Sequence, residues 1–104
     1  MWLVVMFDLP TQTKKDRKRY RWLYQYLQKQ GYIRLQYSVY AKVFSSVGSA
    51  VNGKKRLKEF LKINIKNGNV RFLMFTDAQF ANMEVIIGKP TKEEKYIQKS
   101  LFDF

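Results

Sequence analysis

The sequence predicts an α+β fold in which an antiparallel sheet carries two helices on one face. Short apolar segments with strand character alternate with stretches of helical spacing, and 104 residues suit one compact domain. Neither an internal repeat nor a linker interrupts the chain. We therefore expect a single domain over residues 1–104, with residues 89–104 as a C-terminal tail that packs on the sheet or on a dimer partner.

The first strand and helix have clear boundaries. Residues 2–7 are continuously apolar, and Pro10 prevents the strand from continuing. Thr13 and Asp16 fit a capping box, and apolar residues then recur at helical spacing until Gly31. The sequence predicts a strand covered on both faces, followed by a helix from about residue 14 to residue 30.

Residues 33–43 alternate with a period of two, which predicts one strand with a more polar side. One face would hold Ile33, Leu35, Tyr37, Val39, Ala41 and Val43, and the other Arg34, Gln36, Ser38, Tyr40 and Lys42. A second helix is expected over residues 54–65, where Gly53 would fray or break its start.

A turn at residues 66–69 leads to an apolar strand over 70–75, and a short strand is expected over 83–87. Taken in order, the segments give strand, helix, strand, helix, strand, strand. This order is close to that of a ferredoxin-like sandwich, which is the expected architecture.

The strands at 2–7 and 70–75 are apolar at almost every position, although a sheet with helices on one face normally leaves its other face in water. Two explanations remain open. The second face lies beneath the C-terminal tail with Leu101, Phe102 and Phe104, or it joins two copies of the chain in a twofold homodimer.

Charge and composition exclude several function classes. The chain has 20 Lys and Arg against 8 Asp and Glu, a net charge of +12 that favours an anionic partner such as nucleic acid. It contains no Cys and no His, which excludes disulfides, thiolate zinc sites and imidazole catalysis. Any bound metal ion would therefore have oxygen ligands, which favours Mg²⁺, Mn²⁺ or Ca²⁺. The opening apolar run is too short to span a bilayer, so we expect a cytoplasmic protein without a membrane partner.

Basic side chains cluster on the first helix and again around the second. The candidates for nucleic-acid contact are Lys14, Lys15, Arg17, Lys18 and Arg21. They would contact phosphates, or alternatively form a solvated helix face. Helical phasing places Trp22 outward among these cations, where it would stack on a base, meet a protein partner or lie under the tail.

Asp8 is the candidate for metal chemistry, because it is the acidic residue that closes the first strand. A twofold axis nearby would pair two Asp8 carboxylates, which would then favour a bound cation; otherwise Asp8 is a turn residue. Ser38 has no neighbouring base to activate it, so it would support the site by hydrogen bonding to a metal-bound water or a phosphate, or serve as an interface residue. Asp77 fits a turn or cap.

These residues together resemble the CRISPR-associated protein two family. The resemblance rests on Phe7-Asp8 at the end of the first strand, the basic helix, Leu35-Gln36-Tyr37-Ser38-Val39-Tyr40, Thr76-Asp77-Ala78-Gln79-Phe80 and Met83-Glu84-Val85-Ile86-Ile87-Gly88. It covers nearly the whole chain. The opening Phe-Asp-Leu-Pro is also similar to the branch encoded beside a single large RNA-guided effector nuclease.

The resemblance implies a ferredoxin-like homodimer that works with the CRISPR integrase subunit and holds duplex DNA during spacer acquisition. It also implies an Mg²⁺-dependent endonuclease activity, with Mn²⁺ as a substitute, in which the metal-binding and catalytic aspartate falls on Asp8 and the second-strand serine on Ser38. Tyr37 stands where relatives of this branch often have an acidic residue, and no second carboxylate is assigned. We expect the scaffold role to be primary.

Two other function classes remain as alternatives: an RNA-binding module and a toxin-type ribonuclease of the same fold. The strand at 70–75 lacks the glycine and aromatic spacing of an RNA-recognition motif. An integrase gene and a repeat array beside this gene would favour the adaptation subunit over both.

Overall fold

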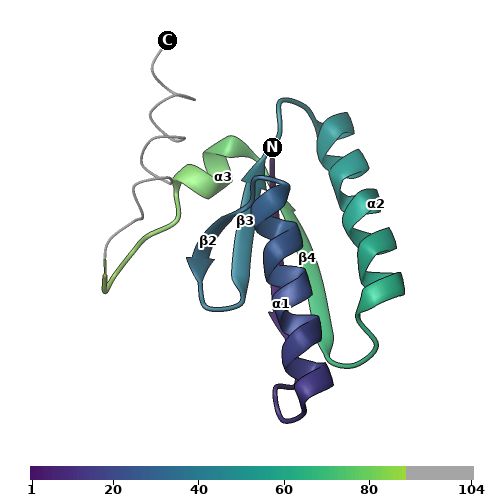
Figure 1. Ribbon diagram of the computed structural model, residues 1–104. Coiled ribbons are helices and arrows are strands. Elements are labelled where there is room, and N and C mark those ends of the chain that lie inside the picture. Colours follow the sequence, from purple (N-terminus) through teal and green to yellow (C-terminus); the bar gives the residue numbers. More distant parts are fainter. Residues whose placement is uncertain (89–104) are drawn as a thin grey trace.

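The computed structural model describes residues 1–88, which form an α+β sandwich (Figure 1). In chain order the elements are β1 (Trp2–Asp8), α1 (Lys14–Lys29), β2 (Ile33–Gln36), β3 (Val39–Val43), α2 (Val47–Asn64), β4 (Asn69–Phe75) and α3 (Asp77–Ala81). The four-stranded sheet has the order β2-β3-β1-β4, and each pair of neighbours is antiparallel. Both long helices pack on the same face, which confirms the predicted ferredoxin-like sandwich.

The start of α1 follows the predicted capping box. The Thr13 hydroxyl accepts a hydrogen bond from the Asp16 amide at 3.0 Å, and the Asp16 carboxylate accepts one from the Thr13 amide at 3.2 Å. Leu23 and Leu27 are fully buried against the sheet. Gly31 follows the helix at a φ of 86°, which a residue with a side chain rarely adopts.

The prediction of one strand over residues 33–43 is wrong, because the segment folds into a hairpin of β2 and β3. The chain turns at Tyr37 and Ser38, and Ser38 has a φ of 65°. The register also shifts between Arg34 and Gln36. The break places two strands before the second helix, so the observed order is strand, helix, strand, strand, helix, strand, followed by the short helix α3.

The more polar side of this segment is divided between solvent and the helices: Arg34 and Gln36 are exposed, whereas Tyr40 and Lys42 turn toward the helices. Tyr40 is buried in the helix-side core, and the Lys42 ammonium lies 5.9 Å and 5.1 Å from the ring centroids of Tyr32 and Phe44. Burial lowers the pKa of Lys42, and the charge of Arg56 lowers it further. Aromatic rings around the lysine make this inward position tolerable.

The second helix begins earlier than residue 54. Ser46 caps it, with its hydroxyl accepting from the Ser49 amide at 3.1 Å, and α2 starts at Val47. Gly53 neither frays nor breaks the helix. It is buried against Phe44, and an added Cβ there would lie 2.4 Å from the ring. The glycine therefore permits close packing between α2 and the end of β3.

The expected strand over 83–87 is absent from the described structure, where Ile86 and Ile87 are exposed. The chain instead forms α3 directly after β4. Phe80 of α3 stacks on Trp2 with 3.7 Å between ring centroids, and the Met1 amino group forms an ion pair with Asp77 at 2.6 Å. Asp77 thus joins the chain start to α3, whereas the cap of this helix is Thr76, so the expected cap or turn role of Asp77 is replaced by an ion pair.

The second face of the sheet carries its own apolar cluster, built on Trp2, Val4, Ala41 and Phe80. Helix α3 covers one end of this face (Figure 1), whereas Leu73 of β4 stays 49% exposed. The predicted packing of the tail, with Leu101, Phe102 and Phe104, lies outside the described residues. Within residues 1–88, no helix has the length and apolar character needed to cross a membrane.

Candidate nucleic-acid interface and metal site

Asp8 lies at the last position of β1, opposite Asn69 at the start of β4. Its side chain is exposed, and within residues 1–88 it takes part in no salt bridge or side-chain hydrogen bond. Gly68 packs against the Asp8 backbone, since a Cβ on Gly68 would lie 2.7 Å from the Asp8 carbonyl oxygen. The fold therefore holds the backbone of Asp8 firmly and leaves its carboxylate available.

Ser38 lies near the same end of the sheet, but in the hairpin turn rather than within a strand. Its carbonyl oxygen accepts a hydrogen bond from the Phe7 amide at 3.0 Å, which places Ser38 beside the residue that precedes Asp8. Its hydroxyl is 3.0 Å from the hydroxyl of Tyr20. Burial raises the pKa of the Tyr20 phenol, while the hydrogen bond to Ser38 opposes that shift.

The donor chemistry at Asp8 suits a hard cation, because a carboxylate oxygen is a ligand that Mg²⁺ and Mn²⁺ accept. One carboxylate does not complete such a site. Among the described residues, no three acidic, His or Cys side chains come close enough together to hold a metal ion. A cation at Asp8 therefore needs further ligands, and a second copy of Asp8 stays a prediction for one of them.

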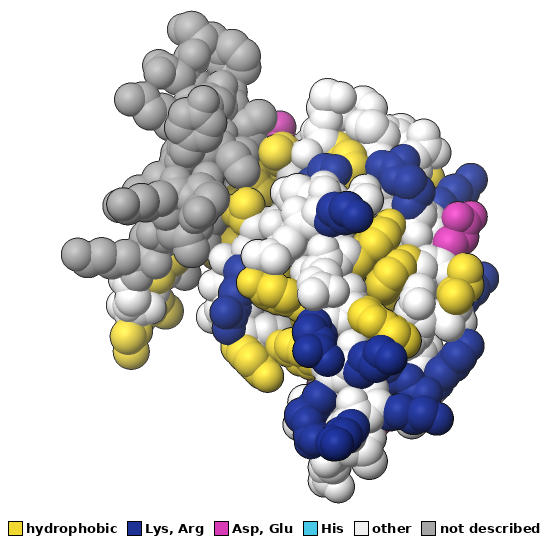
Figure 2. Space-filling model, viewed as in Figure 1, with side chains coloured by type: hydrophobic (Ala, Val, Ile, Leu, Met, Phe, Trp, Pro, Cys, Tyr) yellow, Lys and Arg dark blue, Asp and Glu magenta, His cyan; other side chains and the backbone are white. Residues whose placement is uncertain are grey.

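The predicted nucleic-acid contacts are all exposed on α1: Lys14, Lys15, Arg17, Lys18 and Arg21. Figure 2 shows Lys and Arg side chains gathered over the part of the surface where α1 begins. Within residues 1–88, the single salt bridge joins Met1 to Asp77, so none of these cations is neutralised by a described carboxylate. The α1 surface is thus open to an anionic ligand.

Arg17 differs from the other cations of this group. Its guanidinium donates to the carbonyl oxygens of Thr11 and Gln12, at 3.2 Å and 3.0 Å. This contact fixes the loop between β1 and α1. Arg17 therefore has a structural role beside any contact with phosphate, which its sequence position did not reveal.

Trp22 faces outward as predicted and is 38% exposed. The Lys18 ammonium lies 5.2 Å from its ring centroid, in the range of a cation–π contact. This contact provides part of the explanation for an exposed tryptophan among cations. Within the described residues, Lys18 is thus the cation that packs on the Trp22 ring.

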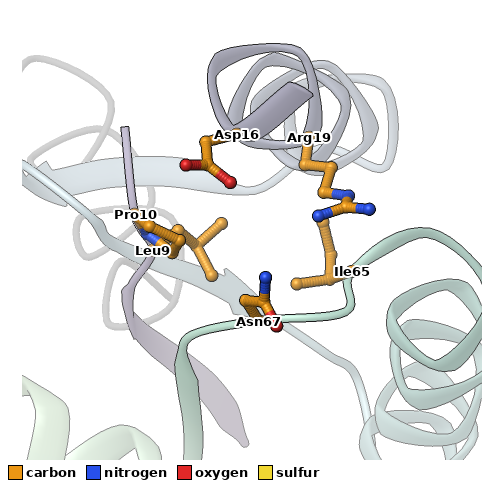
Figure 3. A pocket seen from close by; sticks show the side chains of 6 residues that line it. All are labelled: Leu9, Pro10, Asp16, Arg19, Ile65 and Asn67. Atoms are coloured by element: carbon orange, nitrogen blue, oxygen red, sulfur yellow. The ribbon is translucent and has the colours of Figure 1, made fainter. Parts of the chain in front are cut away.

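A shallow hollow lies between the start of α1 and the loops at this end of the sheet (Figure 3). It is lined by Leu9, Pro10, Asp16, Arg19, Ile65 and Asn67. The hollow encloses no space for a ligand, and its walls are mostly apolar or carry charges of opposite sign. It marks where the loops pack together rather than a binding cavity.

Sequence reasoning missed the aromatic side chains around Ser38. The Tyr20 ring stacks on Tyr37 with 5.9 Å between centroids, and the Arg34 guanidinium lies 5.4 Å from the Tyr37 centroid. Helical phasing did predict that Tyr20 faces inward. No sequence signal indicated that it meets the hairpin turn, because this contact joins α1 to the turn across 18 positions.

The comparisons with known proteins agree with this fold. The family described as CRISPR associated protein Cas2 matches residues 1–83. The chain is 39% identical over 93 residues to "CRISPR-associated endoribonuclease Cas2" of Ligilactobacillus salivarius, covering 89% of each chain. It is 40% identical over 89 residues to the protein of the same name from Parvibaculum lavamentivorans, covering 86% of this chain and 85% of the relative.

A solved structure gives the same result. The crystal structure of Streptococcus pyogenes Cas2 at pH 6.5 superposes with a TM-score of 0.60 and 25% identity, covering 83% of this chain and 99% of that one. The family match extends over both the Asp8 strand end and the basic helix. On the strength of this match and of relatives near 40% identity over most of their length, the chain belongs to the Cas2 family of CRISPR-associated proteins.

Proposed function

We propose that this chain acts in spacer acquisition as a basic homodimeric scaffold that binds duplex DNA together with the CRISPR integrase. The observation that carries the proposal is the α1 surface, whose exposed lysines and arginines have no described carboxylate partner. Its cations match the regular phosphate charge of a duplex, which needs no sequence readout. Family membership supplies the CRISPR context.

The dimer in this proposal forms through the open sheet face. Trp2, Val4 and Ala41 are buried within this apolar face, and Leu73 remains half exposed on its surface. A twofold contact here would bury the exposed part of β4. It would also be the way for two copies of Asp8 to approach one another.

Salt dependence of duplex binding tests the scaffold proposal. The variant Lys15→Ala/Lys18→Ala/Arg21→Ala removes exposed cations from α1 and leaves Arg17 to hold its loop. We expect the slope of log affinity against log salt to fall by about 0.9 for each phosphate that the variant no longer neutralises. Fluorescence anisotropy with a labelled blunt duplex at several salt concentrations measures it.

The matched control is Lys55→Ala/Lys58→Ala/Lys62→Ala, which removes the same charge from exposed positions of α2. An unchanged slope in the α1 variant together with a reduced slope in the α2 variant would contradict the assignment of the interface to α1. Equal slopes for both variants and the unaltered protein would contradict duplex binding through either helix.

A metal-dependent phosphodiesterase activity at Asp8 is a second function, favoured by the exposed carboxylate and by the relatives' name, endoribonuclease. A bound Mg²⁺ or Mn²⁺ would supply an activated water and neutralise charge on the phosphate. Asp8 would hold the cation, and Ser38 would orient a water or a phosphate oxygen through its hydroxyl. The relatives' name favours RNA as the substrate.

Cleavage assays with Asp8→Asn test this second function. We expect the variant to keep its fold and its DNA affinity and to lose all Mg²⁺- or Mn²⁺-dependent cleavage of RNA and DNA. Cleavage at the unaltered rate, after removal of contaminating nucleases, would refute the assignment of Asp8.

A further inference from the structure

Tyr37 stands out among the aromatic side chains of residues 1–88 because it is the most exposed of them, at 68%. It lies in the turn between β2 and β3, at the tip of the hairpin (Figure 1). Exposing an aromatic ring to this extent costs the free energy that burial would provide. Burial of apolar area therefore does not account for the tyrosine at this position.

The exposed ring is nevertheless held in one orientation. Tyr20 stacks on it at an interplanar angle of 20°, and the 5.9 Å between centroids means that the rings are offset, so Tyr20 covers only part of one face. The next residue, Ser38, is anchored by its hydroxyl to Tyr20 and by its carbonyl oxygen to Phe7. The ring is thus pre-oriented on a rigid support while most of its surface remains in water.

The surroundings of Tyr37 are basic. The Arg34 guanidinium lies 5.4 Å from its ring centroid, and Tyr20 connects it to α1, where the exposed Arg17 and Arg21 lie three positions before and one position after Tyr20. No salt bridge within residues 1–88 neutralises these arginines. Proteins that bind unpaired nucleotides combine an exposed aromatic ring with a row of surface cations. The ring stacks on a base, and the cations contact the backbone.

We propose that Tyr37 is a stacking platform for an unpaired nucleobase of a strand whose backbone follows the basic surface of α1. Bases within a duplex are already stacked on their neighbours, so the ring takes a nucleotide only from a single strand or from a splayed duplex end. The Phe7–Ser38 hydrogen bond fixes this platform to the end of β1, on the same side of the sheet as α1. The inference rests on the proposed function, because it adds a ligand class to the same nucleic-acid surface.

Stacking on a tyrosine face is tolerant of sequence, since every base has a π-face. We therefore expect similar affinity for different bases at the stacked position, in both RNA and DNA. Loss of one stacking side chain weakens single-strand binding by about tenfold, and blunt duplex binding stays unchanged. This difference between single strand and duplex separates stacking from simple charge attraction.

The experiment uses the full chain with a short single-stranded oligonucleotide that carries 2-aminopurine, and a blunt duplex of the same length. The variants are Tyr37→Ala, Tyr37→Phe and, as a matched control, Ile63→Ala, which truncates a 71% exposed side chain on α2. Binding should quench 2-aminopurine fluorescence in the unaltered protein, Tyr37→Phe and Ile63→Ala. Tyr37→Ala should lose the quenching and bind the single strand about tenfold more weakly.

Each alternative result has a defined meaning. If Tyr37→Ala binds the single strand like the unaltered protein, or weakens duplex binding equally, the stacking platform is overturned while duplex binding through α1 stands. If Tyr37→Ala changes the sedimentation coefficient, Tyr37 belongs to a contact between copies and the proposal is likewise overturned. If the unaltered protein binds neither probe, the proposed function fails as well.

Discussion

Tyr32 shows how a single buried side chain links the fold to pH. It follows α1 and packs into the helix-side core, where burial raises its pKa to about 12. The phenolate is thus less favourable in the folded chain than in the unfolded chain, where tyrosine titrates near 10. The stability that the buried phenol contributes is complete below pH 10 and is lost as the pH rises toward 12.

Tyr32→Phe should remove this loss. Between about pH 9 and pH 12, the free energy of unfolding of the unaltered protein should fall more steeply than that of Tyr32→Phe, because the variant has no phenol to ionise at this position. Urea unfolding at several alkaline pH values measures it. Tyr37→Phe, at an exposed position, is the control; equal pH slopes for the unaltered protein and Tyr32→Phe would contradict the argument.

The sequence could reveal some residues of the candidate site but not others. Asp8 and the α1 cations could be identified from their positions, because a strand end and a helical face are both readable from local spacing. The contact of Tyr20 with Ser38 could not, since it depends on where the hairpin turn meets α1. Likewise, nothing in the local sequence indicated that Arg17 bonds backward to Thr11 and Gln12.

At the level of elements, the errors of sequence reasoning share a physical cause. The β2–β3 turn was missed because it uses Ser38 at a φ of 65°, without the glycine or asparagine that usually signals such a conformation. The start of α2 was missed because Gly53, read locally, is a poor helix former. In the folded chain, Gly53 lies inside the helix because the Phe44 ring packs where a side chain would otherwise stand. The capped start of α1 and the turn that precedes β4 were predicted correctly, because both depend on local sequence signals.

The cap of α2 provides a prediction at this scale. Ser46→Ala removes the hydroxyl that accepts from the Ser49 amide, so the free energy of unfolding should fall by about 1 kcal/mol. Urea denaturation followed by circular dichroism measures the change. Ser45→Ala, one position outside the cap and exposed, should have little effect; an equal loss in both variants would show that the cap does not stabilise the start of α2.

For the whole molecule, the open sheet face and the basic helical face suggest different partners. Leu73 projects half exposed from the apolar face, opposite Val4 of β1. The α1 cations lie on the helical face, on the other side of the sheet. A dimer formed through the sheet would therefore leave the basic surfaces of both copies open to nucleic acid.

Leu73→Lys tests this arrangement of faces. In sedimentation equilibrium at micromolar concentration, the unaltered chain should be a dimer and Leu73→Lys a monomer, because two buried ammonium groups would oppose the contact. Ile63→Lys, on α2, should remain dimeric. A monomeric unaltered chain would contradict the sheet-facing dimer and favour coverage of that face from within one chain.

The central claim is that this Cas2-family chain serves adaptation as a phosphate-binding scaffold, and spacer acquisition in cells tests it most directly. The measurement compares new spacers gained with the unaltered chain, Asp8→Asn and Lys15→Ala/Lys18→Ala/Arg21→Ala, at equal protein levels. We expect Asp8→Asn to support acquisition and the triple variant to lose it, because phosphate contact rather than cleavage is required. Loss of acquisition in Asp8→Asn, with duplex affinity retained, would contradict the claim and make the metal chemistry at Asp8 essential.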